Sequence, residues 1–173
     1  MIKAYFDGAC DPNPYGDMGI GAIILKDDQE IFKYSEVIPA SKKNSSSVAE
    51  YLALEKILIY IRDTTIIEEQ IFIYGDSKMV INQMHGDWNI IDGMYVPAAT
   101  RCLDLGIEIV NEIKKILLLT WIPRELNQVA DGLSKEKLIK SDIPFPFGGY
   151  RPISKFERRE NKDWLEISKK IKK

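Results

Sequence analysis

Two runs of strand-forming residues end on an aspartate instead of the glycine, asparagine or proline of an ordinary turn. The run "IKAYFD" ends on Asp7, and "IFIYGD" ends on Asp76. Two carboxylates held side by side at strand ends repel each other unless a positive group lies between them. These two aspartates therefore indicate a site for a cation.

Two further acids follow the same logic, Glu50 in "SSSVAEYLAL" and Asp131 in "NQVADGLSK". Hard divalent ions such as Mg²⁺ and Mn²⁺ prefer carboxylate oxygens, and Mg²⁺ leaves room for water and phosphate. A pair of such ions about 3.5–4 Å apart can activate a water and stabilise the leaving oxygen of a phosphodiester. With one histidine and two isolated cysteines, the chain offers no zinc cluster instead.

Each acid except Asp7 also has a purely structural interpretation. Asp76 precedes a helix predicted to begin at Ser77, where it would serve as an N-cap. Ser47 and Glu50 have the spacing of a capping box, and Asp131 suits the dipole at the start of a helix. Asp7 is followed by Gly-Ala-Cys and has no helix to cap. These alternatives remain open at the level of sequence.

The hydrophobic periodicity predicts the elements that must position these acids. Three strands in a meander precede a long helix, a fourth strand, two helices, a fifth strand and a final helix. This order predicts an α/β fold with a five-stranded mixed sheet flanked by helices, in which the first three strands are antiparallel and strands one, four and five are parallel. The predicted ranges are 2–7, 19–25, 30–38, 45–63, 70–74, 77–86, 94–113, 115–122 and 127–139.

If strand four lies beside strand one, their carboxyl ends meet at one edge of the sheet. Neighbouring strands are about 4.8 Å apart, so Asp7 and Asp76 would reach a shared cation. Ligand sites in open α/β sheets favour this edge.

The composition predicts one globular domain of 173 residues, with 45% hydrophobic and 29% charged residues. The net charge is −2, made of +5 over residues 151–173 and −7 over the rest. No apolar run reaches the roughly 18 residues that span a bilayer, and the first residues show no signal pattern. We therefore expect a cytoplasmic protein without a membrane partner, a monomer by default, with Cys10 and Cys102 as plain thiols.

Four motifs occur together in the order and rough spacing of type 1 ribonuclease H, in its plant- and archaeal-like branch. They read "YFDGACDPNPYGDMGIGAIIL", "SSSVAEYLAL", "IYGDSKMVINQMHGDW" and "WIPRELNQVADGLSK". The resemblance implies a ribonuclease H-like catalytic domain over residues 1–140. Residues 141–173 would form a wrap rich in proline, glycine and aromatic residues, then a basic tail. The family's catalytic and metal-binding acids fall on Asp7, Glu50, Asp76 and Asp131.

The activity implied by the resemblance is hydrolysis of the RNA strand of RNA–DNA hybrids. It would use two Mg²⁺ ions, with Mn²⁺ as an alternative, and leave 3′-hydroxyl and 5′-phosphate ends. The basic tail would grip the nucleic acid electrostatically or simply be solvated.

The same resemblance assigns substrate contacts. An asparagine that can read the RNA 2′-hydroxyl is replaced here by a run of serines, and the loop histidine of many relatives is absent, its role unfilled or taken by Arg124. Lys78 would meet a phosphate or be an exposed helix lysine; Asn127 would orient the last loop or cap a helix. The implied contacts are Asn13, Ser45, Ser46, Ser47, Lys78, Arg124 and Asn127.

Two other functions compete with the nuclease interpretation. Proofreading-type exonucleases carry Asp-x-Glu on the first strand, whereas Gly8 and Ala9 follow Asp7 here. A hybrid- or RNA-binding module without catalysis would be favoured if one acid were missing, but all four are present. We further expect His85 at the surface or substrate edge and Trp88 in the core.

Overall fold

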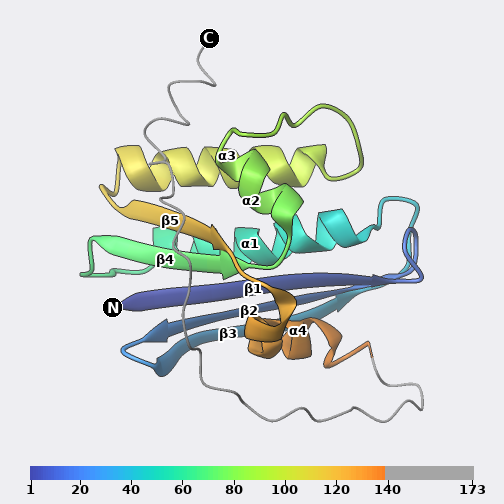
Figure 1. Cartoon of the computed structure of the whole chain (residues 1–173), viewed down its shortest axis with the longest axis horizontal. Helices are drawn as coiled ribbons and strands as arrows, with labels where there is room; N and C mark the ends of the chain where they lie inside the picture. Colours follow the sequence, from blue (N-terminus) through green and yellow to red (C-terminus); the bar gives the residue numbers. More distant parts are fainter. Residues whose placement is uncertain (139–173) are drawn as a thin grey trace.

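One five-stranded sheet forms the centre of the computed structural model, which describes residues 1–138 (Figure 1). The strand order is β3-β2-β1-β4-β5. The first three strands are antiparallel, and β1, β4 and β5 are parallel, which confirms the predicted fold class. The strands are β1 (Ile2–Asp11), β2 (Asp17–Lys26), β3 (Gln29–Ile38), β4 (Gln70–Gly75) and β5 (Ile116–Trp121).

Four α-helices and one short 3₁₀ turn accompany the sheet within the described residues. Every predicted helix is present, with ends shifted by a few residues. Gly106 lies inside the third helix, and Cys102 of that helix is buried as expected. The helical elements are α1 (Ser46–Asp63), α2 (Lys78–Met84), α3 (Val96–Asn111), the 3₁₀ turn η1 (Arg124–Leu126) and α4 (Gln128–Lys135).

Strand β1 does not end at Asp7, as the sequence suggested, but continues to Asp11. Its two edges differ. Pairing with β4 stops at Phe6 and Gly75, whereas antiparallel pairing with β2 continues to Asp11 and Asp17. The extra hydrogen bonds to β2 keep the chain extended beyond Asp7. Asp7 therefore marks the point where the parallel ladder opens.

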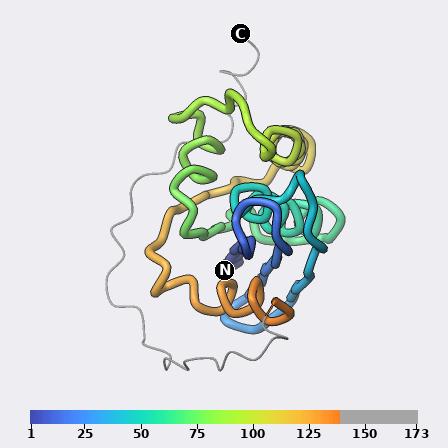
Figure 2. Tube along the Cα trace, turned by 90° about the vertical axis from the view of Figure 1, so that its right-hand side faces the viewer, coloured from blue at the N-terminus to red at the C-terminus, as the bar shows by residue number. Residues whose placement is uncertain are grey.

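The two faces of the sheet carry different helices. Ile2, Ala4 and Phe6 of β1 are fully buried in the main core beneath α1. Because successive side chains of a strand alternate between faces, Asp7 points to the other face, where α4 packs. Figures 1 and 2 show α1 and α3 on one side of the sheet and α4 on the opposite side.

Two glycines let the helices approach the sheet closely. A Cβ at Gly8 would lie 2.2 Å from the backbone of Ala49 and Glu50 in α1, and one at Gly19 would lie 1.6 Å from the carbonyl oxygen of Ser134 in α4. No side chain fits at such distances, so only glycine permits this packing. The glycine next to Asp7 thus brings the Glu50 segment of α1 against β1.

The loop between α2 and α3 corrects one expectation. Trp88 is 50% exposed rather than in the core, and Ile91 and Met94 of the same loop are exposed as well. Among the helices of residues 1–138, none has the length and apolar character needed to cross a bilayer. The wrap and basic tail predicted for residues 141–173 lie outside the described residues.

Candidate active site

Three of the four predicted acids meet at the end of the β1–β4 ladder. One carboxylate oxygen from each of Asp7, Glu50 and Asp76 lies within 4.8 Å of the other two. Asp7 comes from β1, Asp76 directly follows β4, and Glu50 comes from α1 across the edge of the sheet. The predicted convergence of these three side chains is confirmed.

The local structure removes two of the structural interpretations. Helix α1 is capped by Ser45, whose Oγ accepts a hydrogen bond from the Val48 N–H at 3.2 Å. The cap therefore lies two residues before Ser47, and Glu50 is not part of a capping box. Helix α2 is likewise capped by Ser77 and not by Asp76. Both acids are left to face the cluster.

Burial and mutual repulsion make these carboxyls difficult to ionise. Burial raises the pKa of Asp7 from 3.8 to about 6; the charges of Asp76 and Asp131 add to the rise, and a hydrogen bond from Ser134 opposes it. Burial also raises the pKa of Glu50 well above its usual value, reinforced by Asp7 and Asp76. A cation among them would reverse both shifts, since an opposite charge favours the ionised form.

An unpaired oxygen supports the same conclusion. Within the described residues, the buried Oε2 of Glu50 has no hydrogen-bond partner. A buried polar atom without a partner is costly, and it calls for a water or an ion. Three carboxylates with a free buried oxygen fit a hard divalent cation such as Mg²⁺ or Mn²⁺.

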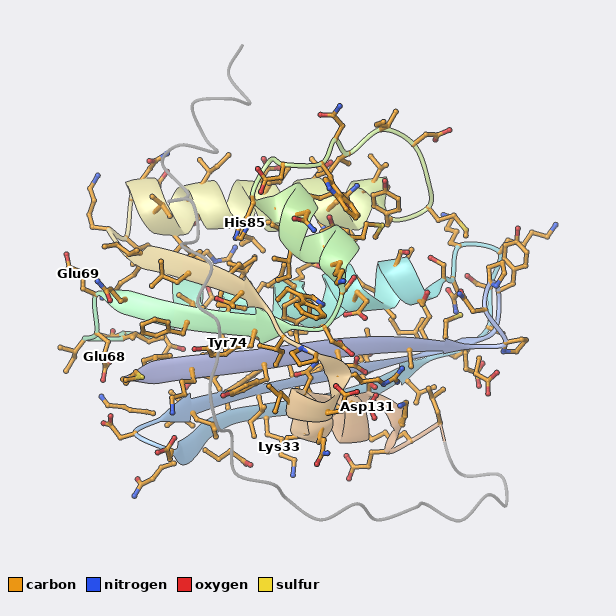
Figure 3. All side chains as sticks on the ribbon, in the orientation of Figure 1. Lys33, Glu68, Glu69, Tyr74, His85 and Asp131 are labelled. Atoms are coloured by element: carbon orange, nitrogen blue, oxygen red, sulfur yellow. The ribbon has the colours of Figure 1, made fainter. Side chains whose placement is uncertain are left out.

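The fourth predicted acid, Asp131, takes part differently. It lies in the first turn of α4 (Figure 3), and its Oδ1 accepts hydrogen bonds from Arg124 Nε at 2.8 Å and from Lys135 Nζ at 2.6 Å. Burial opposes its ionisation, but the bonds from Lys135 and Arg124 together outweigh burial and lower its pKa. Asp131 is therefore an ionised carboxylate already held by two cations at the border of the cluster.

Two residues that were not singled out from the sequence organise the cluster. The hydroxyl of Ser134 donates to Oδ2 of Asp7, and Lys135 binds Asp131 as described. Both lie three to four residues after Asp131, so the helical repeat places all three on one face of α4. That spacing was a usable signal for Lys135. The Ser134–Asp7 contact spans 127 positions and has no local signal.

Six of the seven predicted substrate contacts are exposed or partly exposed, and we call these six residues, at positions 13, 45, 46, 47, 78 and 124, the rim. Asn13 Oδ1 accepts from the Ser46 N–H at 3.0 Å, and its Nδ2 donates to Ser46 Oγ at 3.1 Å, which ties the β1–β2 loop to the start of α1. Ser45 and Ser47 flank this contact and are partly exposed. Asn127 is fully buried and donates to Phe6 O at 2.8 Å.

Lys78, another residue of the rim, is exposed at the start of α2. Its ammonium lies 4.6 Å from the centre of the Trp121 ring, a cation–π contact. Trp121 in turn donates from Nε1 to the Asp76 carbonyl at 3.0 Å. The positively charged Lys78 thus lies two residues after Asp76.

His85 was expected at the surface or substrate edge, but it is buried at the end of α2 (Figure 3). Its Nε2 lies 3.0 Å from the carbonyl oxygen of Leu119 in β5. A carbonyl oxygen can only accept, so Nε2 carries the proton. The residue links α2 to the sheet and belongs to the core.

A family model and a relative each match most of the chain. The family model described as "Reverse transcriptase-like" matches residues 5–137. The uncharacterized protein YpeP of Bacillus subtilis (strain 168) is 30% identical over 143 residues, which cover 79% of this chain. The match covers only 58% of the length of YpeP.

Two solved structures are similar over most of the chain. Ribonuclease H1 from the halophilic archaeon Halobacterium salinarum NRC-1 shares 28% identity with a TM-score of 0.66, over 79% of this chain and 96% of that one. LC11-RNase H1, solved in complex with an RNA/DNA hybrid, shares 25% identity with a TM-score of 0.65, over 77% and 93% of the two chains. The chain therefore belongs to the reverse transcriptase-like family, and its fold is that of type 1 ribonuclease H.

Proposed function

We propose that this protein is a divalent-metal-dependent endonuclease that hydrolyses the RNA strand of RNA–DNA hybrids and leaves 3′-hydroxyl and 5′-phosphate ends. The observation that carries the proposal is the cluster of Asp7, Glu50 and Asp76 with the buried, unpaired Oε2 of Glu50. The complex of LC11-RNase H1 with a hybrid supports the choice of substrate.

Two metal ions, Mg²⁺ or alternatively Mn²⁺, would be held by Asp7, Glu50, Asp76 and Asp131. When bound, they would supply positive charge for the scissile phosphate and promote ionisation of the attacking water. The protein's part is to hold the carboxylates in place. Ser134 orients Asp7, and Gly8 lets α1 bring Glu50 against β1.

Arg124 and Lys135 would keep Asp131 ready to bind metal. Their charges hold Asp131 ionised at the edge of the cluster until a phosphate approaches. Arg124 is an exposed fork of donors that can turn from a carboxylate to a phosphate, because guanidinium groups bind both bidentately. In this way Arg124 would take the place of the loop histidine that the chain lacks.

Substrate recognition would use the exposed residues of the rim. Asn13 and the serines at positions 45, 46 and 47 would contact the hybrid where the β1–β2 loop meets α1. Lys78, at the start of α2, would meet a phosphate. We assign Asn127 a positioning role, because its buried amide donates to Phe6 O and Asp76 Oδ1 rather than toward solvent.

The catalytic domain is proposed to span residues 1–140, in agreement with the family match over residues 5–137. A monomer is proposed as the working unit. We further propose that the protein acts in the cytoplasm.

The decisive experiment compares a labelled RNA–DNA hybrid, double-stranded RNA and double-stranded DNA, each with Mg²⁺, with Mn²⁺ and with a chelator. We expect cleavage of the RNA strand of the hybrid, only with metal, and products whose 3′ ends a polymerase can extend. Hybrid binding without cleavage under every condition would instead identify a binding module and refute the nuclease.

A further inference from the structure

One exposed aromatic residue adopts an unfavourable backbone conformation. Tyr15, in the loop between β1 and β2, has φ of 83°. This left-handed region is disfavoured for any residue with a Cβ, and for bulky side chains more than for asparagine or aspartate. Residues held in such conformations persist only where the surrounding structure imposes them, and they gather at functional sites.

Hydrogen bonds on both sides impose this conformation on the loop. The Tyr15 N–H donates to the carbonyl of Asn44 at 2.9 Å, and the Gly16 N–H donates to that of Pro12 at 2.8 Å. The buried amide of Asn44 donates to the Gly16 carbonyl at 2.8 Å and to that of Pro39 at 2.9 Å. The backbone at Tyr15 is therefore held from both sides.

The side chain gains little from this arrangement inside the protein. Tyr15 is 55% exposed although its backbone is held by hydrogen bonds. Burial of a large aromatic ring in the core would offset the free-energy cost of backbone strain, but an exposed ring gains little burial. The strain is explained if the ring serves a contact outside the chain.

The loop places Tyr15 near Asn13 of the rim proposed to bind substrate. Asn13, two residues earlier, bonds both to the backbone N–H and to the hydroxyl of Ser46. Ser46 begins α1, and Glu50 lies about 6 Å further along that helix at 1.5 Å per residue. A duplex seated on the cluster and extending toward Asn13 would therefore meet Tyr15 next.

We propose that the Tyr15 ring packs against the sugar–phosphate backbone of the bound hybrid, in the minor groove beside Asn13. The inference rests on the proposed function. A-form-like duplexes have a wide, shallow minor groove that admits a side chain, whereas the minor groove of B-form DNA is narrow. A rigid ring also gains contact area at a small cost in conformational entropy. Tyr15 thus contributes to selecting hybrid over DNA duplex, independently of base sequence.

Replacing Tyr15 with glycine separates strain from function. Glycine adopts positive φ freely, so Tyr15→Gly should fold with an unchanged or higher melting temperature. We expect KM for a labelled hybrid to rise about tenfold, which corresponds to about 1.4 kcal/mol, with kcat unchanged. Binding of the same hybrid, measured by fluorescence anisotropy in the Asp7→Asn background, should weaken equally, and the preference over DNA duplex should shrink.

Three further variants make the result specific. Tyr15→Phe keeps the ring and should bind as wild type, while Tyr15→Asn, which tolerates the left-handed region, should resemble Tyr15→Gly. Lys114→Gly relieves another positive φ, of 60°, in the turn before β5. Lys114 lies at the amino end of β5, whereas the acids meet at the carboxyl ends of β1 and β4, so this variant should leave KM unchanged.

Wild-type KM and affinity in Tyr15→Gly would overturn the role of Tyr15 while leaving the nuclease intact. Failure of the unmodified protein to bind hybrid would instead overturn the proposed function, and the Tyr15 contact with it.

Discussion

Asn127 and Asp76 are joined by a hydrogen bond, from Nδ2 to Oδ1 at 3.2 Å, although 51 positions separate them. The same Nδ2 donates to the carbonyl of Phe6 at 2.8 Å. Phe6 and Gly75 are the last pair of the parallel β1–β4 ladder. Asn127 therefore bridges the two strand ends where their own pairing stops, and it holds Asp76 beside Asp7.

Removal of this bridge should destabilise the protein. We expect Asn127→Ala to lower the free energy of unfolding by about 2–3 kcal/mol, because a buried carbonyl and a carboxylate both lose their donor. Urea denaturation measures this change. Asn82→Ala is the matched control, since within residues 1–138 the Asn82 amide donates to the Lys78 carbonyl of its own helix, and it should cost less than about 1 kcal/mol. Equal losses in the two variants would contradict a bridging role for Asn127.

Asp7→Asn tests the assignment of the cluster to catalysis. We expect hybrid cleavage to fall by more than about 100-fold, because the variant loses a central negative ligand worth several kcal/mol. Hybrid affinity should persist within a few fold. Asp63→Asn, which changes an exposed aspartate paired with Arg62 at the end of α1, serves as control and should cleave normally. An Asp7→Asn protein that still cuts the RNA strand would refute the role assigned to Asp7.

The raised pKa of Asp7 predicts a pH-dependent effect of the same substitution on stability. Its folded-state value, about 6, lies above the ordinary 3.8, so its contribution to stability is complete below pH 3.8 and declines as pH rises toward 6. In the presence of a chelator, Asp7→Asn should therefore exceed wild type in unfolding free energy by about 1–3 kcal/mol at pH 8 and match it near pH 4. Denaturation across this range measures the difference. A gap that is the same at both pH values would contradict a strained, ionised Asp7.

Divalent metal should reverse the stability difference between wild type and Asp7→Asn, since a cation that binds only the folded state stabilises it more, the higher its concentration relative to Kd. Added Mg²⁺ or Mn²⁺ should raise the stability of wild type more than that of Asp7→Asn at pH 8.

In the proposed metal site, Lys135 would compete with the metal for Asp131, because its ammonium already binds Asp131 Oδ1. We expect Lys135→Met, which keeps the apolar length but removes the charge, to tighten Mn²⁺ binding by about 3- to 10-fold, since a nearby positive charge worth about 1 kcal/mol is lost. Calorimetric titration without substrate measures this affinity. Lys137→Met is the control, because Lys137 donates to the Ser35 carbonyl rather than to Asp131. The same gain in both variants would show a general charge effect and not competition at Asp131.

Much of the fold could be predicted from local pattern. Alternating and helical periodicities depend on neighbours in sequence, and they located all five strands and four helices of residues 1–138. The meeting of Asp7 and Asp76 followed from a general rule, because parallel strands align their carboxyl ends. The capping residue of α1 was misplaced, since three consecutive serines, Ser45 to Ser47, have the same local chemistry and only packing selects among them.

The positions and partners of several individual side chains escaped prediction. Trp88, expected in the core, is exposed, and His85, expected at the surface, is buried. Loop geometry decides which of two nearby residues reaches the core. The ion pairs of Asp131 depend on how the flexible chains of Arg124 and Lys135 extend.

The sequence by itself determined which elements form and which acids stand at their ends, because propensity and periodicity act over a few residues. Only the tertiary structure decided that Glu50 reaches the cluster with an unpaired oxygen, that Ser134 holds Asp7, and that Asp131 faces two cations. Those contacts depend on the close approach of α1 and α4 to opposite faces of one sheet. Such an approach follows from the packing of the whole core, which no local stretch of sequence encodes.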